Sequence, residues 1–152
     1  MPEQPSAAPA SAGWVVDASV TMPWIFPDKA TPFTERLLNA LGTQVLWAPT
    51  RWVLECTNVL QSAQRRRRID AHRRMEIAGE LSELPVRLDS QVLDFVTLDR
   101  LAHTHGLSVY DAAYLELAQR RSFVLVSLDA RLIAAAHAVG HPVLSATQDI
   151  GS

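Results

Sequence analysis

Four carboxylates lie far apart in the sequence and could act together on one substrate: Asp17, Glu55, Asp111 and Asp129. Four carboxylates crowded into one place cannot all stay ionised unless a cation compensates their charge. Mg²⁺ prefers oxygen ligands, keeps several of its waters and accepts phosphate oxygens. A bound metal ion lowers the pKa of its water and stabilises charge on a phosphate. The chemistry that these residue types predict is therefore metal-assisted hydrolysis of a phosphodiester bond.

The chain must fold so that these acids meet, and its apolar pattern predicts how. Short apolar runs alternate with longer segments of helical pattern, and no Asn-Gly or Asp-Gly turn joins two of the runs. That alternation predicts an α/β fold in which helices cover both faces of a parallel sheet. Residues 18–25 are expected to form one or two helical turns that Pro23 interrupts. We expect strands at 14–16, 45–47, 86–88, 123–126 and 142–144, and further helices at 31–41, 51–67, 70–84, 90–105, 108–120 and 129–139.

All four acids fall at one edge of this predicted sheet. Asp17 ends the first strand and Asp129 follows the fourth, while Glu55 lies about one turn into the helix after the second strand. Asp111 begins the helix that leads into the fourth strand. Ligands of such folds bind beyond the carboxyl ends of the strands, so the four acids are expected to form one site. Three polar neighbours are expected to support it: Ser19, Asn58 and Ser127.

Each acid also has a purely structural explanation when it is taken alone. Asp129 could cap a helix, Ser108 followed by Asp111 fits a capping box, and Glu55 could complement its helix dipole. Asp17 follows three apolar residues and is expected to be largely buried, which is harder to explain without a function. The convergence of all four acids favours the chemical interpretation.

The composition excludes several classes of protein. Of the 152 residues, 48% are hydrophobic and 20% are charged, which is the balance of a folded domain. No apolar run approaches the roughly 18 residues that a membrane helix needs. Cys56, the one cysteine, excludes an internal disulfide and is expected to be a buried packing residue. Because the net charge is −2, any nucleic acid would have to be bound by local patches and metal ions.

The two ends of the chain and one basic segment stand apart from the strand and helix pattern. Residues 1–13 are rich in Pro, Ala and Ser and are expected to be a flexible tail. They lack the apolar stretch of a signal peptide, so a cytoplasmic location is expected. Residues 148–152 are expected to be a short C-terminal tail. An arginine run is expected to be either a solvated helix end or a patch that binds RNA or a partner: Arg65, Arg66, Arg67 and Arg68.

The segments around the acids resemble the PIN domain and, within that family, toxins of the VapC type. The resemblance covers 14–147 and rests on 15–19 (VVDAS), on Pro49 with Glu55 and Asn58, on 110–118 (YDAAYLELA) and on 126–132 (VSLDARL). It implies a three-layer α/β/α sandwich with a central parallel sheet and an endoribonuclease site that depends on Mg²⁺ or Mn²⁺. It also implies that Asp17, Glu55, Asp111 and Asp129 are the catalytic, metal-binding acids.

The same resemblance implies partners. VapC-type toxins usually form homodimers, act on structured RNA such as tRNA, and are silenced by a cognate VapB-type antitoxin whose C-terminal segment covers the site. Two other hypotheses stay open: a PIN-fold binding module with an unused site, and an aspartate-based phosphotransfer protein. The second is disfavoured because Ser19, not an acid, stands two residues after Asp17, and because Lys29 is not at a predicted strand end.

Three further acids are expected to lie outside the site. Glu116 comes five residues after Asp111, which turns it away from that side of the helix. Asp94 and Asp99 fall within the predicted helix 90–105 and are expected to face solvent.

Overall fold

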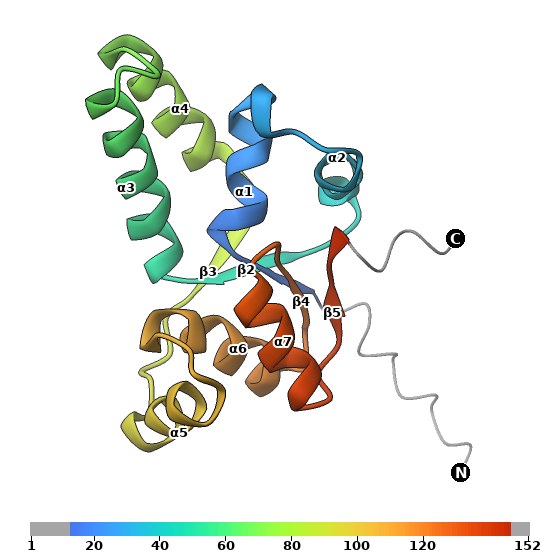
Figure 1. Ribbon diagram of the computed structural model, residues 1–152. Helices are drawn as coiled ribbons and strands as arrows, with labels where there is room; N and C mark the ends of the chain where they lie inside the picture. Colours follow the sequence, from blue (N-terminus) through green and yellow to red (C-terminus); the bar gives the residue numbers. More distant parts are fainter. Residues whose placement is uncertain (1–12, 147–152) are drawn as a thin grey trace.

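A five-stranded parallel sheet forms the centre of the computed structural model, which describes residues 13–146 (Figure 1). The strand order is β3-β2-β1-β4-β5, and all four neighbouring pairs are parallel. The five predicted strands and the α/β class are thereby confirmed. Their bounds are β1 (Trp14–Val16), β2 (Leu46–Pro49), β3 (Val86–Asp89), β4 (Val124–Val126) and β5 (Val143–Leu144).

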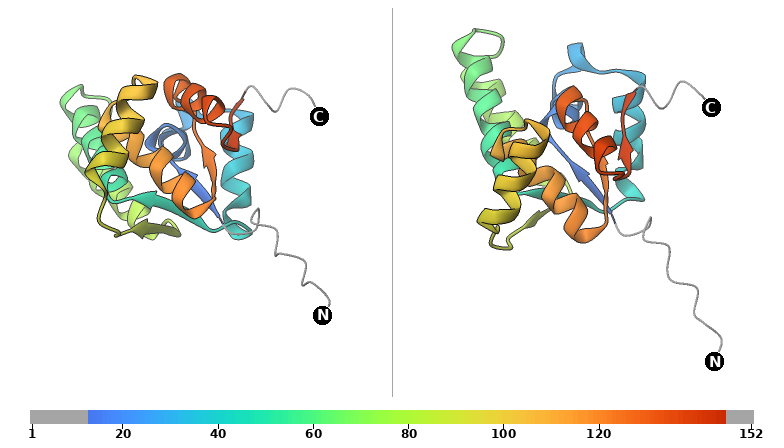
Figure 2. Two further views of the ribbon diagram at one scale, coloured as in Figure 1. Left: turned by 90° about the horizontal axis from the view of Figure 1, so that it is seen from below. Right: turned by 60° about the horizontal axis from the view of Figure 1, so that its bottom comes forward.

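Within residues 13–146, seven α-helices and two short 3₁₀ helices surround the sheet. Helices α1 and α2 lie on one side of it and α5, α6 and α7 on the other, while α3 and α4 pack together and project past its edge (Figures 1 and 2). The bounds are α1 (Ala18–Ile25), η2 (Pro27–Lys29), α2 (Pro32–Asn39), η3 (Ala40–Gly42), α3 (Arg51–Arg65), α4 (Ala71–Glu83), α5 (Phe95–His105), α6 (Val109–Arg121) and α7 (Ala130–Ala138).

Two helix predictions were wrong in detail. Helix α1 runs through Pro23 without interruption, because Val20, Met22 and Ile25 anchor it in the core on both sides of the proline. Helix α5 begins at Phe95 rather than at residue 90, because Asp94 caps it by accepting a hydrogen bond from the Thr97 amide at 2.8 Å. Asp94 is therefore exposed, as expected, but precedes the helix.

The core follows from the alternation of side chains along the strands. Val15 and Leu125 point into the larger buried cluster, which contains residues of α3, α6 and α7. Val16 and Val126, their neighbours in sequence, point into a second cluster on the other side of the sheet, together with Phe33 and other residues of α1 and α2. The sheet is thus buried on both faces, as parallel sheets usually are.

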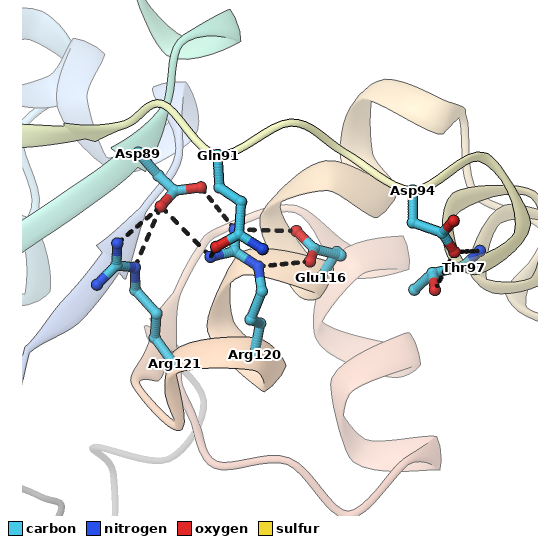
Figure 3. A network of polar contacts seen from close by, with 7 residues as sticks. All are labelled: Asp89, Gln91, Asp94, Thr97, Glu116, Arg120 and Arg121. Atoms are coloured by element: carbon cyan, nitrogen blue, oxygen red, sulfur yellow. Dashed lines mark hydrogen bonds and ion pairs between the residues drawn. The ribbon is translucent and has the colours of Figure 1, made fainter.

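The connection from β3 to α5 is tied to the end of α6 by a polar network (Figure 3). Asp89, the last residue of β3, is 7% exposed and accepts hydrogen bonds from both Arg120 and Arg121. Arg120 also binds Glu116 at 2.7 Å and Gln91 at 3.0 Å. Glu116 is thus occupied within this network, in agreement with its exclusion from the site.

The strand order reverses at the centre of the sheet, and this determines where a ligand would bind. From β1 the chain moves outward through β2 to β3, then returns to the other side of β1 as β4 and continues to β5. Adjacent strands whose connections leave in opposite directions open a crevice at their carboxyl ends, between β1 and β4 in this fold. Asp17 and Ser127 follow these two strands directly.

Some expectations concern residues at the ends of the chain or its relation to a membrane. Residues 1–12 and 148–152 of the two expected tails lie outside the described residues. Gly13 is buried and its carbonyl accepts a hydrogen bond from the Val124 amide, so it belongs to the fold. Across 13–146, none of the helices is both long and apolar enough to span a bilayer.

Candidate active site

Asp17 is the most buried of the four predicted acids, and both of its carboxylate oxygens accept hydrogen bonds. It follows β1 and caps α1, and it is 5% exposed. Its Oδ1 accepts hydrogen bonds from the amide of Ser19, at 3.1 Å, and from the hydroxyl of the same residue. Its Oδ2 accepts one from the hydroxyl of Ser127 at 2.6 Å. Both carboxylate oxygens are therefore held in place by the chain itself.

The two serines link Asp17 to the segment between β4 and α7. The Ser19 hydroxyl accepts a hydrogen bond from the Leu128 amide at 2.9 Å, and the Ser127 hydroxyl accepts one from the Asp129 amide at 3.0 Å. Asp129 in turn caps α7, because its Oδ1 accepts from the Leu132 amide at 2.9 Å. Asp17 and Asp129 are thus positioned by one continuous set of hydrogen bonds across the β1–β4 crevice.

Glu55 is brought to the same place by α3. Trp52 of this helix is 6% exposed, and its Nε1 donates a hydrogen bond of 3.0 Å to Thr21 of α1. Thr21 in turn donates to the carbonyl of Asp17 at 3.0 Å, so α3 is aligned on the backbone of the central acid. Glu55 Oε1 lies 2.8 Å from Arg51 Nε, one helical turn earlier.

Asp111 enters from α6, which runs toward the sheet from the carboxyl edge of the strands. Ser108 caps this helix by accepting a hydrogen bond from the Asp111 amide at 3.0 Å, which is the serine half of the expected capping box. The side chain of Asp111 is partly buried in the first turn of the helix. Its backbone amide completes the cap, while its carboxylate, which also interacts with the Ser108 hydroxyl, faces the charges of Asp129 and Arg51.

The pKa values of three acids show that the four share one electrostatic environment. Burial raises the pKa of Asp17, and the charge of Asp129 raises it further against the lowering effect of the two serines. Burial also raises the pKa of Glu55, which Arg51 lowers and the charges of Asp111 and Asp17 raise. The pKa of Asp111 is raised by burial and by Asp129. The structure thus brings the acids near enough to disfavour one another's charge.

The donor set fits a hard divalent cation, although the side chains do not enclose one. Within residues 13–146, no three His, Cys, Asp or Glu side chains lie close enough together to hold a metal ion among them. Mg²⁺ is usually bound by one or two carboxylates and fills its other positions with water or phosphate oxygens. Carboxylates that raise one another's pKa are stabilised in their ionised form by the positive charge of a bound cation. The residues therefore fit Mg²⁺ or Mn²⁺ as an open, partly hydrated site.

Three residues that border the acids were not singled out from the sequence. Arg51 lies beside Glu55 and over the ring of Tyr110, with its Cζ 3.5 Å from the ring centroid. Tyr114 is 1% exposed, and within the described part of the chain its hydroxyl has no hydrogen-bond partner. Burial and the charges of Glu55 and Asp17 raise the pKa of this hydroxyl. Spacing could have indicated two of them, since Arg51 precedes Glu55 by four residues and Tyr114 follows Asp111 by three.

Asn58, Cys56 and most of the arginine run lie on α3 with Glu55. Asn58 is exposed on α3 and takes no part in the hydrogen bonds that join the acids. The arginine run (65–68) is exposed at the far end of α3, about 15 Å along the helix axis from Glu55. Cys56 is 2% exposed, and burial followed by the charges of Glu55 and Asp17 raises its pKa to about 12. It is the buried packing residue that was predicted.

Comparisons with known proteins agree with this architecture. The family described as PIN domain matches residues 14–138. The fold is similar to PAE2754 from Pyrobaculum aerophilum, with a TM-score of 0.66, 20% identity and 93% of each chain covered. It is also similar to FitAcB from Neisseria gonorrhoeae, with a TM-score of 0.63 and 13% identity over 86% of this chain and 96% of that one. A third similar structure is FitAB bound to an IR36 DNA fragment, with a TM-score of 0.63 and 13% identity over 87% of this chain and 94% of that one. No curated protein sequence matches the chain.

Proposed function

This chain belongs to the PIN domain family, and from that premise we propose that it is a metal-dependent endoribonuclease, the toxin of a VapBC-type toxin–antitoxin pair. The observation that carries the proposal is the position of Asp17, Glu55, Asp111 and Asp129 around the β1–β4 crevice, where each of three of them has its pKa raised by the charge of another. A binding protein would gain nothing from four acids that oppose one another's ionisation. A site that binds a divalent cation and a phosphodiester gains from them, because the acids bind the cation and the cation compensates their charge.

In the proposed site one or two of the four acids would bind Mg²⁺ or Mn²⁺ directly and the others through the ion's waters, because no three of the described side chains lie close enough to enclose it. When bound, the ion would stabilise negative charge on the phosphate and make a bound water more acidic. Asp17 serves as the fixed ligand, because Ser19 and Ser127 orient both of its oxygens. Glu55 and Asp111 are less buried than Asp17 and have raised pKa values. They are the acids suited to accept a proton from the attacking water.

Protein partners belong to the same proposal. The chain exposes large apolar side chains around the start of α5, where Val92 and Phe95 are each 90% exposed and Val96 is 62% exposed. Exposed apolar patches of this kind mark surfaces that contact other proteins. They support an antitoxin partner and a homodimer, both of which the family resemblance implies.

The test is cleavage of a total tRNA pool by the purified chain, free of antitoxin. The reaction is run with Mg²⁺, with Mn²⁺ and with EDTA, beside the Asp17→Asn variant. We expect discrete fragments that require both a divalent ion and Asp17. A folded chain that yields no fragments and shows no heat of metal binding in calorimetry would contradict the proposal and favour a binding module with an unused site. Metal binding without fragments from tRNA would direct the search to other RNAs.

A further inference from the structure

Arg51 and Tyr110 form a stacked pair at the rim of the acidic site. Arg51 is the first residue of α3 and Tyr110 the second of α6, and the guanidinium lies over the ring at 3.5 Å from its centroid. Tyr110 directly precedes Asp111, and Arg51 Nε is 2.8 Å from Glu55 Oε1. The pair therefore joins two different acids of the site from the outside.

The pair is open to solvent on its outer side. Tyr110 is 53% exposed and the Arg51 side chain is 33% exposed. A cation–π contact at such a site helps to align two helix ends. That role does not require a tyrosine of which more than half is accessible. The exposed tyrosine offers an aromatic side chain next to the carboxylates.

Among the described residues, the ion pair of Arg51 with Glu55 uses only Nε of the guanidinium group. Although the two atoms are 2.8 Å apart, neither Arg51 Nε nor Glu55 Oε1 has a hydrogen-bond partner among the described residues, so the contact is close but poorly directed. An arginine normally satisfies a carboxylate through its planar fork, with two parallel bonds. The guanidinium instead lies over the Tyr110 ring, and the Arg51 side chain is partly exposed beside Glu55.

We propose that Tyr110 and Arg51 bind the RNA strand at the site of cleavage: a nucleobase stacks on the Tyr110 ring and Arg51 binds a neighbouring backbone phosphate. The inference rests on the proposed nuclease function and adds the class of substrate segment, an unpaired stretch whose bases can leave their own stack. Aromatic stacking holds single-stranded nucleic acid with little regard to sequence, while arginine supplies charge against the repulsion of four carboxylates. The pair thus places the strand beside the acids.

The test measures binding rather than cleavage, in the full chain carrying Asp17→Asn, with Mg²⁺ present. The probe is a labelled single-stranded RNA of mixed sequence, and anisotropy gives the Kd. Tyr110→Leu keeps the apolar volume and removes the ring, so we expect it to weaken binding by about five- to hundredfold. Tyr110→Phe keeps the ring and should bind within about twofold of the parent. Arg51→Met should weaken binding and reduce its dependence on salt, whereas Arg51→Lys should retain most of that dependence.

Two controls make the result specific. Leu38→Ala truncates an exposed apolar side chain on α2, away from both the acids and the partner surface of α5, and should leave the Kd unchanged. A probe with abasic positions should bind the parent and Tyr110→Leu equally, because neither can stack a base that is absent. The proposed stacking on Tyr110 would be overturned if the Tyr110→Leu variant, with an unchanged melting temperature, bound the intact RNA as tightly as the parent. In that case metal-dependent cleavage by the natural chain would still support the nuclease, whereas a parent that binds no RNA would contradict both.

Discussion

The hydroxyl of Ser127 donates a hydrogen bond of 2.6 Å to Asp17 Oδ2, although the two residues are 110 positions apart in the sequence. The bond joins the carboxyl ends of β1 and β4, where the strand order reverses. The same hydroxyl accepts from the amide of Asp129 at 3.0 Å. One buried serine therefore sets the side chain of one acid and the backbone of another.

Replacing Ser127 by Ala is expected to weaken both the fold and the site. The change leaves a buried amide without its acceptor and Asp17 without a donor, which should lower the free energy of unfolding by about 1–3 kcal/mol. Urea denaturation measures this loss, and calorimetry should show weaker Mg²⁺ binding. Ser82→Ala is the matched control, because Ser82 is exposed on α4 and its hydroxyl binds only the Ala78 carbonyl. Equal losses in the two variants would contradict the role of Ser127.

The sequence predicted the sheet and the place of the acids because both depend on local pattern. Apolar runs such as 123–126 are too short for helices and are bounded by polar residues, and parallel pairing then puts the residues that follow them at one edge. Asp17 could be predicted as buried for the same reason. Asn58 was predicted from helical spacing alone, which does not tell whether that turn of α3 faces the crevice or the solvent.

Contacts between distant elements could not be predicted in this way. Arg121 donates a hydrogen bond to Asp89, which lies 32 positions earlier in the chain. The Cζ of Arg121 also lies 4.1 Å from the centroid of the Trp47 ring. The start of α5 was missed for a local reason instead, since Val92 and Leu93 fit the apolar face of a helix but lie before the Asp94 cap. The local pattern indicates which residues are apolar enough to be buried, whereas tertiary contacts determine which of them are buried.

Asp111→Asn is expected to abolish metal-dependent cleavage while the fold is kept. The cap on the backbone amide of Asp111 is supplied by Ser108, and an asparagine at 111 can still contact that hydroxyl. Asparagine has the same shape but loses the charge, so we expect a loss in rate of at least about a hundredfold and an unchanged or higher melting temperature in EDTA. Cleavage of the tRNA pool and circular dichroism measure the two effects. Full cleavage by the folded variant would remove Asp111 from the mechanism.

The metal-free protein is expected to become less stable as the pH rises above the ordinary carboxyl pKa of about 4. The pKa values of Asp17, Glu55 and Asp111 are raised in the folded state, so the folded chain holds protons that the unfolded chain has released. The contribution of these raised pKa values to the free energy of unfolding is complete below the unfolded pKa of about 4. It is lost as the pH rises through the raised pKa values of the folded state. Melting curves in EDTA measure the trend, which should be smaller in Asp17→Asn. Mg²⁺ should stabilise the protein more at pH 8 than at pH 5, and equal stabilisation would contradict the shared site.

Asp89 should have the opposite dependence on pH. Burial raises its pKa, but the hydrogen bonds and charges of Arg120 and Arg121 outweigh burial and lower it overall. Its contribution is present above the unfolded pKa near about 4 and is lost as the pH falls through the lower folded value. Asp89→Asn should reduce the free energy of unfolding by about 1–3 kcal/mol at neutral pH, less than for a fully buried pair because both arginines are partly exposed. Urea denaturation measures this, and Asp99→Asn, an exposed change on α5, should have no effect.

The arginine run (65–68) is expected to bind RNA or the antitoxin without taking part in the chemistry. Its residues are exposed at the end of α3, and the charge of Arg68 is partly used by Asp28 at 3.1 Å. Changing all four to Ala should weaken binding of tRNA and flatten its dependence on salt, because released counterions contribute to affinity. Changing all four to Lys keeps the charge and should retain most of the binding. Filter binding at several salt concentrations measures both variants. If the Ala variant binds RNA and antitoxin as the natural chain does, the arginine run is a solvated helix end that serves solubility alone.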